Sequence, residues 1–172
     1  MITLVLGGAR SGKSELAERM VAALAPTVTY VATAEIGSDS DFAARVETHR
    51  SRRPADWRTV EAGAGLIGAL EALGPEAGAV LVDSLGTWVA AAPDFQVDDD
   101  GLCAALTART GPTVVVSEEV GLGVHPSTEV GVRFRDALGV VNRSVAGIAD
   151  EVLLVVAGRT LRLDRAADAE RA

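Results

Sequence analysis

A glycine-rich run near the start of the sequence carries the residue types that bind phosphate. Residues 7–14 read Gly-Gly-Ala-Arg-Ser-Gly-Lys-Ser, which fits the spacing G-x-x-x-x-G-K-[ST]. Glycines let backbone N–H groups curl around a phosphate, and the following helix N-terminus favours an anion. Lys13, the only lysine in the sequence, can reach the β- and γ-phosphates, and the Ser14 hydroxyl can ligate Mg²⁺. The predicted phosphate-binding residues are Gly7, Gly8, Ala9, Arg10, Ser11, Gly12, Lys13 and Ser14. A chance match in a chain with 18 glycines is the alternative.

Asp83 is a second residue with suitable chemistry. It ends the apolar run Ala79–Asp83, and a carboxylate at the end of a buried strand can hold Mg²⁺ from the side opposite a phosphate loop. The sequence therefore predicts Ser14 and Asp83 as metal ligands. The alternative is that Asp83 caps the following helix through Thr87 and Trp88.

Two further residues lie in expected loops. Glu119 comes just after the expected strand Thr113–Ser117, and loops that follow parallel strands line the ligand crevice of open α/β sheets. The sequence supports a site role and a surface role for Glu119 equally. His125, in the loop sequence at 121–126, is expected to have no catalytic role.

His49 lies in a segment, 41–54, that is expected to begin as a helix and to stop at Pro54. Arg45 and His49 are four residues apart and share a helix face. A dense cationic patch follows in this acidic sequence, made of Arg50, Arg52 and Arg53. A histidine beside arginines is more often a surface residue, so the pattern alone favours a surface role.

The composition is that of an acidic globular chain. Its 172 residues suit one domain, 1–172, that buries roughly two-thirds of its unfolded surface. A net charge of −8 argues against a nucleic-acid surface, which relies on many Lys and Arg contacts to phosphates. Aspartates at 83, 94 and 98–100 interrupt every apolar stretch before it reaches the ~18 residues of a membrane span. We therefore expect no nucleic-acid partner and no membrane insertion.

The ends and the cysteine content point to the compartment. The N-terminus has no basic region typical of a signal peptide and passes from an expected strand directly into the glycine-rich run. Cys103, the single cysteine, cannot form an internal disulfide, and no Cys/His spacing resembles a zinc site. Cys103 is expected to be a small apolar residue on a helix face. We therefore expect a cytoplasmic protein.

Apolar, strand-like runs alternate with helical stretches along the chain. The expected strands are Ile2–Leu6, Val28–Ala32, Ala79–Asp83, Thr113–Ser117, Glu151–Ala157 and Thr160–Leu163. The expected helices include Ser14–Ala25 and Gly101–Arg109. Acidic residues 98–100 are expected to be solvated charge near a helix N-terminus rather than a metal site. The pattern predicts an α/β fold, a mostly parallel sheet flanked by helices, with a C-terminal antiparallel hairpin at its edge.

Several segments together resemble one family. These are GGARSGKS at 7–14, YVATA at 30–34, AARVETHRSRRPADWRT at 43–59, EVGLG at 119–123, and the stretch from Phe134 to Val152. They are similar to the bifunctional adenosylcobinamide kinase/adenosylcobinamide-phosphate guanylyltransferases of cobalamin synthesis, and the resemblance spans nearly the whole chain. The phosphate loop alone is generic, but the segment H-R-x-R-R-P-x-x-W-R-T is specific.

The resemblance implies a P-loop nucleotide-binding enzyme with two reactions. ATP or GTP phosphorylates the aminopropanol hydroxyl of adenosylcobinamide. GMP from GTP is then transferred to that phosphate, which gives adenosylcobinamide-GDP and pyrophosphate. The second reaction passes through a GMP-histidine in this family, and His49 occupies the matching position. A neutral imidazole is a good nucleophile, and adjacent arginines would lower its pKa and neutralise charge developing on the α-phosphate.

The resemblance also assigns residues to the nucleotide site, with Mg²⁺ as cofactor. By positional match they are Thr33, Ala34, Glu35, Arg50, Ser51, Arg52, Arg53, Glu61 and Asp83, with His49 and Lys13 catalytic. Members of the family form trimers, so a homo-oligomer is implied. The chain departs from the family at Glu118, where the pattern S-N-E-V-G has asparagine, and in a short connection at 90–101. No N-K-x-D element for guanine recognition is present.

Overall fold

The computed structural model describes residues 1–34 and 53–165. Its strands form a seven-stranded sheet in the order β3-β2-β4-β5-β1-β6-β7. The strands are β1 Ile2–Gly7, β2 Val28–Ala32, β3 Arg58–Glu61, β4 Ala79–Asp83, β5 Thr113–Glu118, β6 Glu151–Val156 and β7 Arg159–Arg162. All neighbours pair in parallel except β6 and β7, which form an antiparallel hairpin. The predicted α/β fold with a C-terminal edge hairpin is confirmed.

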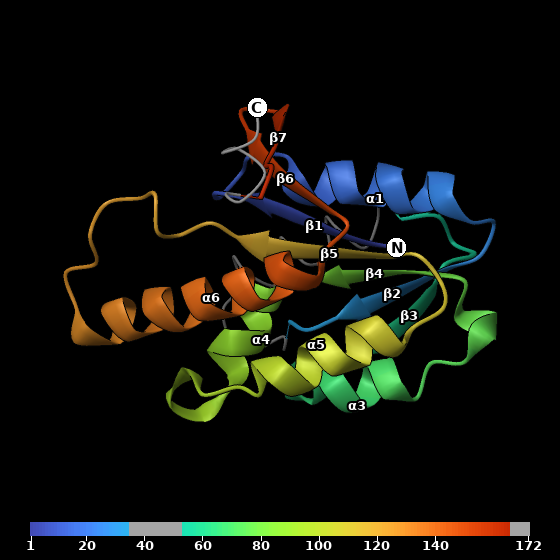
Figure 1. Cartoon of the computed structure of the whole chain (residues 1–172), viewed down its shortest axis with the longest axis horizontal. Helices are drawn as coiled ribbons and strands as arrows, with labels where there is room; N and C mark the ends of the chain where they lie inside the picture. The colour runs from blue at the N-terminus through green and yellow to red at the C-terminus, as the bar shows by residue number, and fades with distance from the viewer. Residues whose placement is uncertain (35–52, 166–172) are drawn as a thin grey trace.

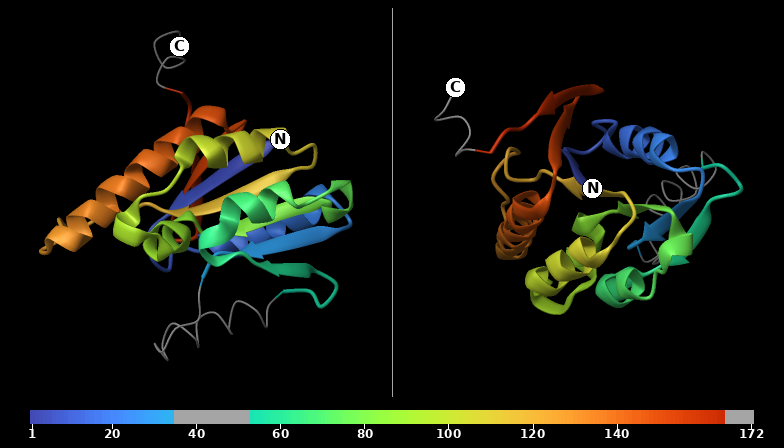
Figure 2. Two further views of the ribbon diagram at one scale, coloured as in Figure 1. Left: turned by 90° about the horizontal axis from the view of Figure 1, so that it is seen from below. Right: turned by 45° about the vertical axis from the view of Figure 1, so that its right-hand side comes forward.

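Helices cover both faces of the sheet. They are α1 Lys13–Leu24, α3 Leu66–Glu71, α4 Leu85–Ala91, α5 Asp99–Ala108 and α6 Glu129–Ile148, with short 3₁₀ turns at Gly63–Gly65, Pro75–Ala77 and Pro93–Phe95. Helix α1 lies on one face, and α3 to α6 lie on the other (Figures 1 and 2). Among the described residues, none of these helices is both long and apolar enough to cross a membrane.

The side chains of the central strands alternate between the two faces of the sheet, which explains why helices cover both faces. In β1, Leu4 and Leu6 pack into the core beneath α4, α5 and α6, whereas Val5 packs with Ala17 and Val21 of α1. Successive side chains of a strand point to opposite faces, so a continuous apolar run becomes buried on both. The central strands therefore lie in a dry interior, and their polar side chains gather at the strand ends.

The parallel arrangement brings the carboxyl ends of six strands, β1 to β6, to one edge. Gly7 at the end of β1 is in register with Glu118 at the end of β5. Ala32 at the end of β2 is in register with Asp83 of β4 and with Glu61 of β3. Residues that are far apart in sequence thus meet at this edge, which carries the glycine-rich loop.

The sequence missed one strand and misplaced some ends. Strand β3 was not expected, because its four residues are largely exposed and form no apolar run. Helix α5 begins two residues earlier than predicted, and Asp98 caps it by accepting a hydrogen bond from the Gly101 backbone N–H at 2.8 Å. Asp98 is therefore the helix cap, and Asp99 and Asp100 lie in the first turn of α5. The described residues hold no cluster of three or more His, Cys, Asp or Glu arranged to bind a metal. Cys103 is a free, half-buried residue that packs against the core, as expected.

Candidate functional site

The glycine-rich run forms a tight loop between β1 and α1. Arg10 and Gly12 adopt positive φ angles of 56° and 92°, a conformation that glycine accepts readily and that lets the backbone N–H groups turn inward. The loop is closed by a hydrogen bond from Ser11 N–H to the Gly8 carbonyl at 3.3 Å. It is also tied to the β6–β7 turn, because Gly158 N–H donates to the Ser11 carbonyl at 2.9 Å. This geometry is that of a phosphate-binding loop, followed by the N-terminus of a 12-residue helix.

Gly7 has to be glycine for steric reasons. A Cβ added there would lie 2.5 Å from Ser11 Oγ and 2.8 Å from the Val155 carbonyl oxygen. The close approach of loop and strand explains the first glycine of the motif. Gly8, in contrast, has open space around its Cα.

Lys13 lies at the first turn of α1 with most of its side chain covered. Its Nζ is 3.4 Å from Glu118 Oε1 and 3.4 Å from the Gly8 carbonyl oxygen. The ammonium group thus sits where the phosphate loop meets the end of β5.

Ser14 and Asp83 face each other across the loop. The Ser14 hydroxyl donates to Asp83 Oδ1 at 3.5 Å, and the Tyr30 hydroxyl donates to Asp83 Oδ2 at 3.1 Å. A hydroxyl and a carboxylate are hard oxygen donors of the kind that Mg²⁺ prefers. These two residues therefore fit a magnesium ion held between the loop and β4.

Arg53 connects this pair to the segment that follows residue 52. Its guanidinium carbon lies 3.7 Å from the centre of the Tyr30 ring. A guanidinium stacked on an aromatic face is attracted by the ring electrons, more strongly when the pair is shielded from water. Arg53, Tyr30, Asp83 and Ser14 therefore form a continuous chain of contacts.

A hydroxyl network fixes the start of α4. Ser84 caps the helix by accepting from the Thr87 backbone N–H, and Thr87 Oγ1 accepts in return from Ser84 N–H, which is a capping box. Thr33 is fully buried; its Oγ1 donates to the Ser84 carbonyl at 2.6 Å and accepts from Ser84 N–H at 2.8 Å. The alternative role of Asp83 as the helix cap is therefore wrong, because Ser84 performs it and leaves the carboxylate directed at the loop.

The remaining predicted residues are placed as follows. Ala34 is half-buried just after β2, and Glu61 is exposed at the end of β3. Glu119 Oε1 accepts from the Gly121 backbone N–H at 2.8 Å, so its carboxylate is used in a local turn. His125 lies on the exposed loop between β5 and α6, with its Nδ1 2.9 Å from Arg135 Nη1. The positions outside the described residues are Glu35, Arg45, His49, Arg50, Ser51 and Arg52.

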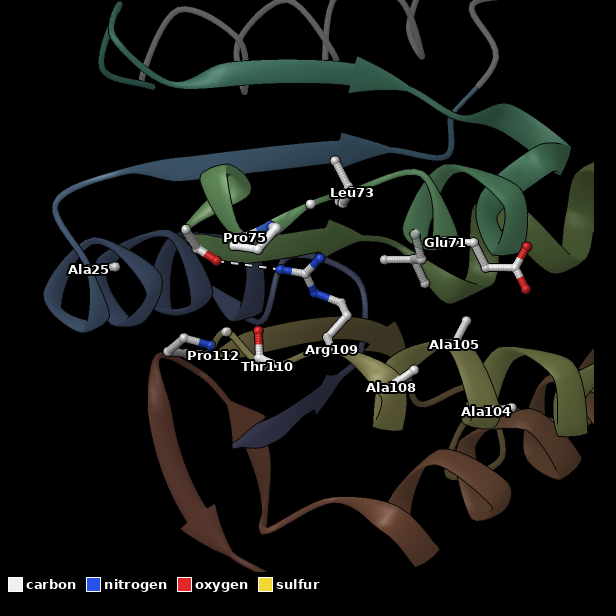
Figure 3. A pocket seen from close by; sticks show the side chains of 14 residues that line it. Ala25, Glu71, Leu73, Pro75, Ala104, Ala105, Ala108, Arg109, Thr110 and Pro112 are labelled. Carbon is white, nitrogen blue, oxygen red and sulfur yellow. Dashed lines mark hydrogen bonds between the residues drawn. The ribbon is translucent and has the colours of Figure 1, made fainter.

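A pocket of about 570 Å³ opens at the opposite edge of the sheet. It lies beside the loops that lead into β4 and β5, and Arg109 crosses it to reach the Gly78 carbonyl at 3.4 Å (Figure 3). Burial lowers the pKa of Arg109 from its ordinary value. None of the predicted site residues within the described ranges lines this pocket, so it is separate from the phosphate loop.

Comparison with known proteins decides the family. The family model described as cobinamide kinase/cobinamide phosphate guanyltransferase matches residues 3–163. The chain belongs to this family. The bifunctional adenosylcobalamin biosynthesis protein CobP of Pseudomonas aeruginosa is 38% identical over 169 residues, covering 95% of this chain and 97% of that relative. CobU of Salmonella typhimurium, with the same bifunctional description, is 39% identical over 178 residues, covering 92% and 97%.

Solved structures of other proteins share the fold of this family member. The flagellar accessory protein FlaH of Methanocaldococcus jannaschii gives a TM-score of 0.52 at 16% identity, covering 92% of this chain and 74% of that one. An ATPase of a bacterial type III secretion system gives 0.53 at 17% identity, covering 99% and 53%. At such low sequence identity, these structural similarities support the fold alone.

The sequence by itself assigned no role in this site to three residues that the structure places here. Tyr30 holds Asp83, Ser84 caps α4, and Glu118 contacts Lys13. Each lies at or near the carboxyl end of a central strand, and the rule that ligands bind at this edge could have drawn attention to them. Their partners, however, depend on strand order, which the sequence does not spell out.

Proposed function

We propose that this chain performs both reactions of its family. It phosphorylates adenosylcobinamide with ATP or GTP, and it then transfers GMP from GTP to the resulting phosphate, releasing pyrophosphate. The observation that carries the proposal is the phosphate loop with Lys13 at its end and the Ser14–Asp83 pair beside it, in a chain that matches the family over residues 3–163.

The phosphate loop supports the kinase step. Backbone N–H groups of residues 8–12 hold the β- and γ-phosphates, and Lys13 neutralises their charge as the acceptor hydroxyl attacks the γ-phosphorus. Ser14 and Asp83 would hold Mg²⁺, which neutralises the phosphate oxygens when bound. Phosphoryl transfer is catalysed mainly by positioning and charge neutralisation, and this small set of groups can supply both effects.

We further propose His49 as the nucleophile of guanylyl transfer. A neutral imidazole nitrogen bonds to the α-phosphorus of GTP while the bond to pyrophosphate breaks. The phosphate oxygen of the corrinoid substrate then displaces the histidine and takes the GMP. The arginines at 50, 52 and 53 favour the neutral imidazole and stabilise negative charge on the leaving group. The contact of Arg53 with Tyr30 supports this role, because it ties the end of this segment to the metal carboxylate.

Covalent labelling tests the guanylyl-transfer half. Wild-type protein is incubated with Mg²⁺ and GTP labelled at the α-phosphate, and protein-bound label is measured after denaturation. We expect label that survives base and is lost in acid, as for a phosphoramidate. His49→Ala should abolish it, and His125→Ala, which alters the other histidine of the sequence, should retain it.

A second measurement separates the two activities. Transfer of the γ-phosphate to adenosylcobinamide should persist in His49→Ala, because that step does not use the histidine. Wild-type protein that phosphorylates adenosylcobinamide but never carries GMP would be a kinase alone. Absence of both activities would overturn the proposal.

Three further parts of the proposal come from the family resemblance and the composition. Mg²⁺ is the expected metal, the cytoplasm the expected compartment, and a homo-oligomer, in the form of a trimer, the expected assembly. Analytical ultracentrifugation measures the assembly directly, and a monomer at micromolar concentration would contradict it.

A further inference from the structure

Glu118 is a charged residue of the site with no role in the reactions described above. It is the last residue of β5, and its backbone is in register with Gly7, where the phosphate loop begins. Its Oε1 lies 3.4 Å from Lys13 Nζ. This chain therefore places a negative charge beside the lysine of its phosphate loop.

The Glu118 carboxylate is anchored rather than loosely placed. Ser84 Oγ is 3.1 Å from Oε1 and 3.0 Å from Oε2, so the hydroxyl donates to the carboxylate. The Glu118 backbone is fixed as well, since Asn142 Nδ2 donates to its carbonyl at 3.0 Å and Asn142 Oδ1 accepts from Ser117 Oγ at 2.6 Å. The side chain is 29% exposed.

The opening of α4 leaves room for this side chain. A Cβ added to Gly86, which is buried in the first turn of α4, would collide with Glu118 Oε2. A larger residue at 86 would therefore force Glu118 away from its present place. Gly86, Ser84 and Lys13 together fix the position of the Glu118 carboxylate.

The Glu118 carboxylate in this position would lie close to a phosphate bound by Lys13. A phosphate oxygen in contact with Lys13 Nζ would lie within about 6–7 Å of Glu118 Oε1, given a contact of about 3 Å to the ammonium. Two anions would then share one cation. A Mg²⁺ ion held by Ser14 and Asp83 would offset that repulsion. The Glu118 carboxylate therefore disfavours the binding of a triphosphate that carries no metal.

We propose that Glu118 is a positioning residue that holds Lys13 in place and makes nucleotide binding depend more strongly on the divalent cation than a neutral side chain would. The inference rests on the proposed triphosphate site at residues 7–14.

Equilibrium binding of GTP, measured calorimetrically in EDTA and in excess MgCl₂, tests the proposal. The variants are Glu118→Gln, which removes the charge and keeps the shape, and Glu15→Gln, which removes the same charge from an exposed ion pair with Arg19 on the same helix as Lys13. We expect Glu118→Gln to bind metal-free GTP about tenfold more tightly than wild type, a gain between the roughly threefold and roughly seventyfold that like charges about 6–7 Å apart give at effective dielectric constants of about 80 and about 20. In excess MgCl₂ the two should agree within about threefold.

The half-saturating Mg²⁺ concentration for GTP binding is the second readout. It should fall in Glu118→Gln and stay unchanged in Glu15→Gln. Equal metal-free affinities of wild type and Glu118→Gln, or an equal gain in Glu15→Gln, would overturn the inference while leaving the proposed function intact. Wild-type protein that binds no GTP even with MgCl₂ would overturn both.

Discussion

Tyr30 donates its phenolic hydrogen to Asp83 across the β2–β4 pair, with 3.1 Å between the two oxygens. This bond holds one carboxylate oxygen while the other accepts from Ser14. The same ring carries Arg53 on its face. Tyr30 thus links the Asp83 carboxylate to Arg53, and its own side chain is buried.

The ionisation of Tyr30 should be displaced to high pH. Burial and the neighbouring Asp83 carboxylate raise the pKa of the phenol well above its ordinary value of 10.0. The sequence has one tyrosine, so the absorbance of tyrosinate near 295 nm reports this residue alone. We expect native protein to titrate well above pH 10 and unfolded protein to titrate near it.

The same displacement predicts a loss of stability in alkali. Between the unfolded and the folded pKa, the unfolded chain releases the phenolic proton and the folded chain retains it. The unfolding free energy therefore falls as pH rises above about 10, by up to about 1.4 kcal/mol per pH unit from this group. Denaturant unfolding at pH 8 and pH 10.5 should show a smaller loss in Tyr30→Phe. An equal loss in both proteins would contradict the assignment.

Removal of the Tyr30 hydroxyl should weaken the use of Mg²⁺. Tyr30→Phe keeps the ring beneath Arg53 but removes a donor that orients Asp83. We expect the half-saturating Mg²⁺ concentration for adenosylcobinamide phosphorylation to rise by about tenfold or more, in keeping with the loss of one hydrogen bond to a charged group that would ligate the metal. Initial rates measured over a range of MgCl₂ check this. An unchanged Mg²⁺ dependence would show that Asp83 does not need Tyr30.

Replacement of Lys13 should remove most phosphoryl transfer. Lys13→Ala deletes the ammonium at the end of the phosphate loop, and we expect kcat to fall by about 10²–10³-fold. Arg19→Ala is the matched control, because it removes an equal charge from an exposed ion pair on the same helix. Steady-state rates with saturating adenosylcobinamide compare them. Comparable rates for Lys13→Ala and wild type would exclude the loop as the kinase site.

Thr33 should contribute to stability through Ser84. Thr33→Val keeps the shape but removes the hydroxyl that bonds both the N–H and the carbonyl of Ser84. We expect the unfolding free energy to fall by about 1–3 kcal/mol, because buried polar groups lose a partner. Thr59→Val, on the exposed edge strand β3, should change it by less than about 0.5 kcal/mol. Urea unfolding measures both, and equal effects would place the stabilisation elsewhere.

Short-range patterns predicted much of this fold. The phosphate loop, the buried strands around it and the C-terminal hairpin follow from local spacing and apolar runs, so they were found at nearly their observed bounds. Strand β3 was missed because its exposed residues carry no pattern, and its place depends on pairing with β2. The residue pattern alone predicted that His49 is a surface histidine, whereas the family resemblance implied that it is a nucleophile.

The sequence by itself determined that a phosphate loop with Lys13 and Ser14 opens the chain, since eight adjacent residues carry all of that chemistry. Only the tertiary structure decided which partners those residues meet. The Tyr30–Asp83 and Lys13–Glu118 contacts join residues far apart in the chain, and they exist because strand order and register bring the ends of β2, β4, β5 and β1 to one edge. Register is a property of the packed sheet as a whole, whereas a loop motif is a property of its own residues.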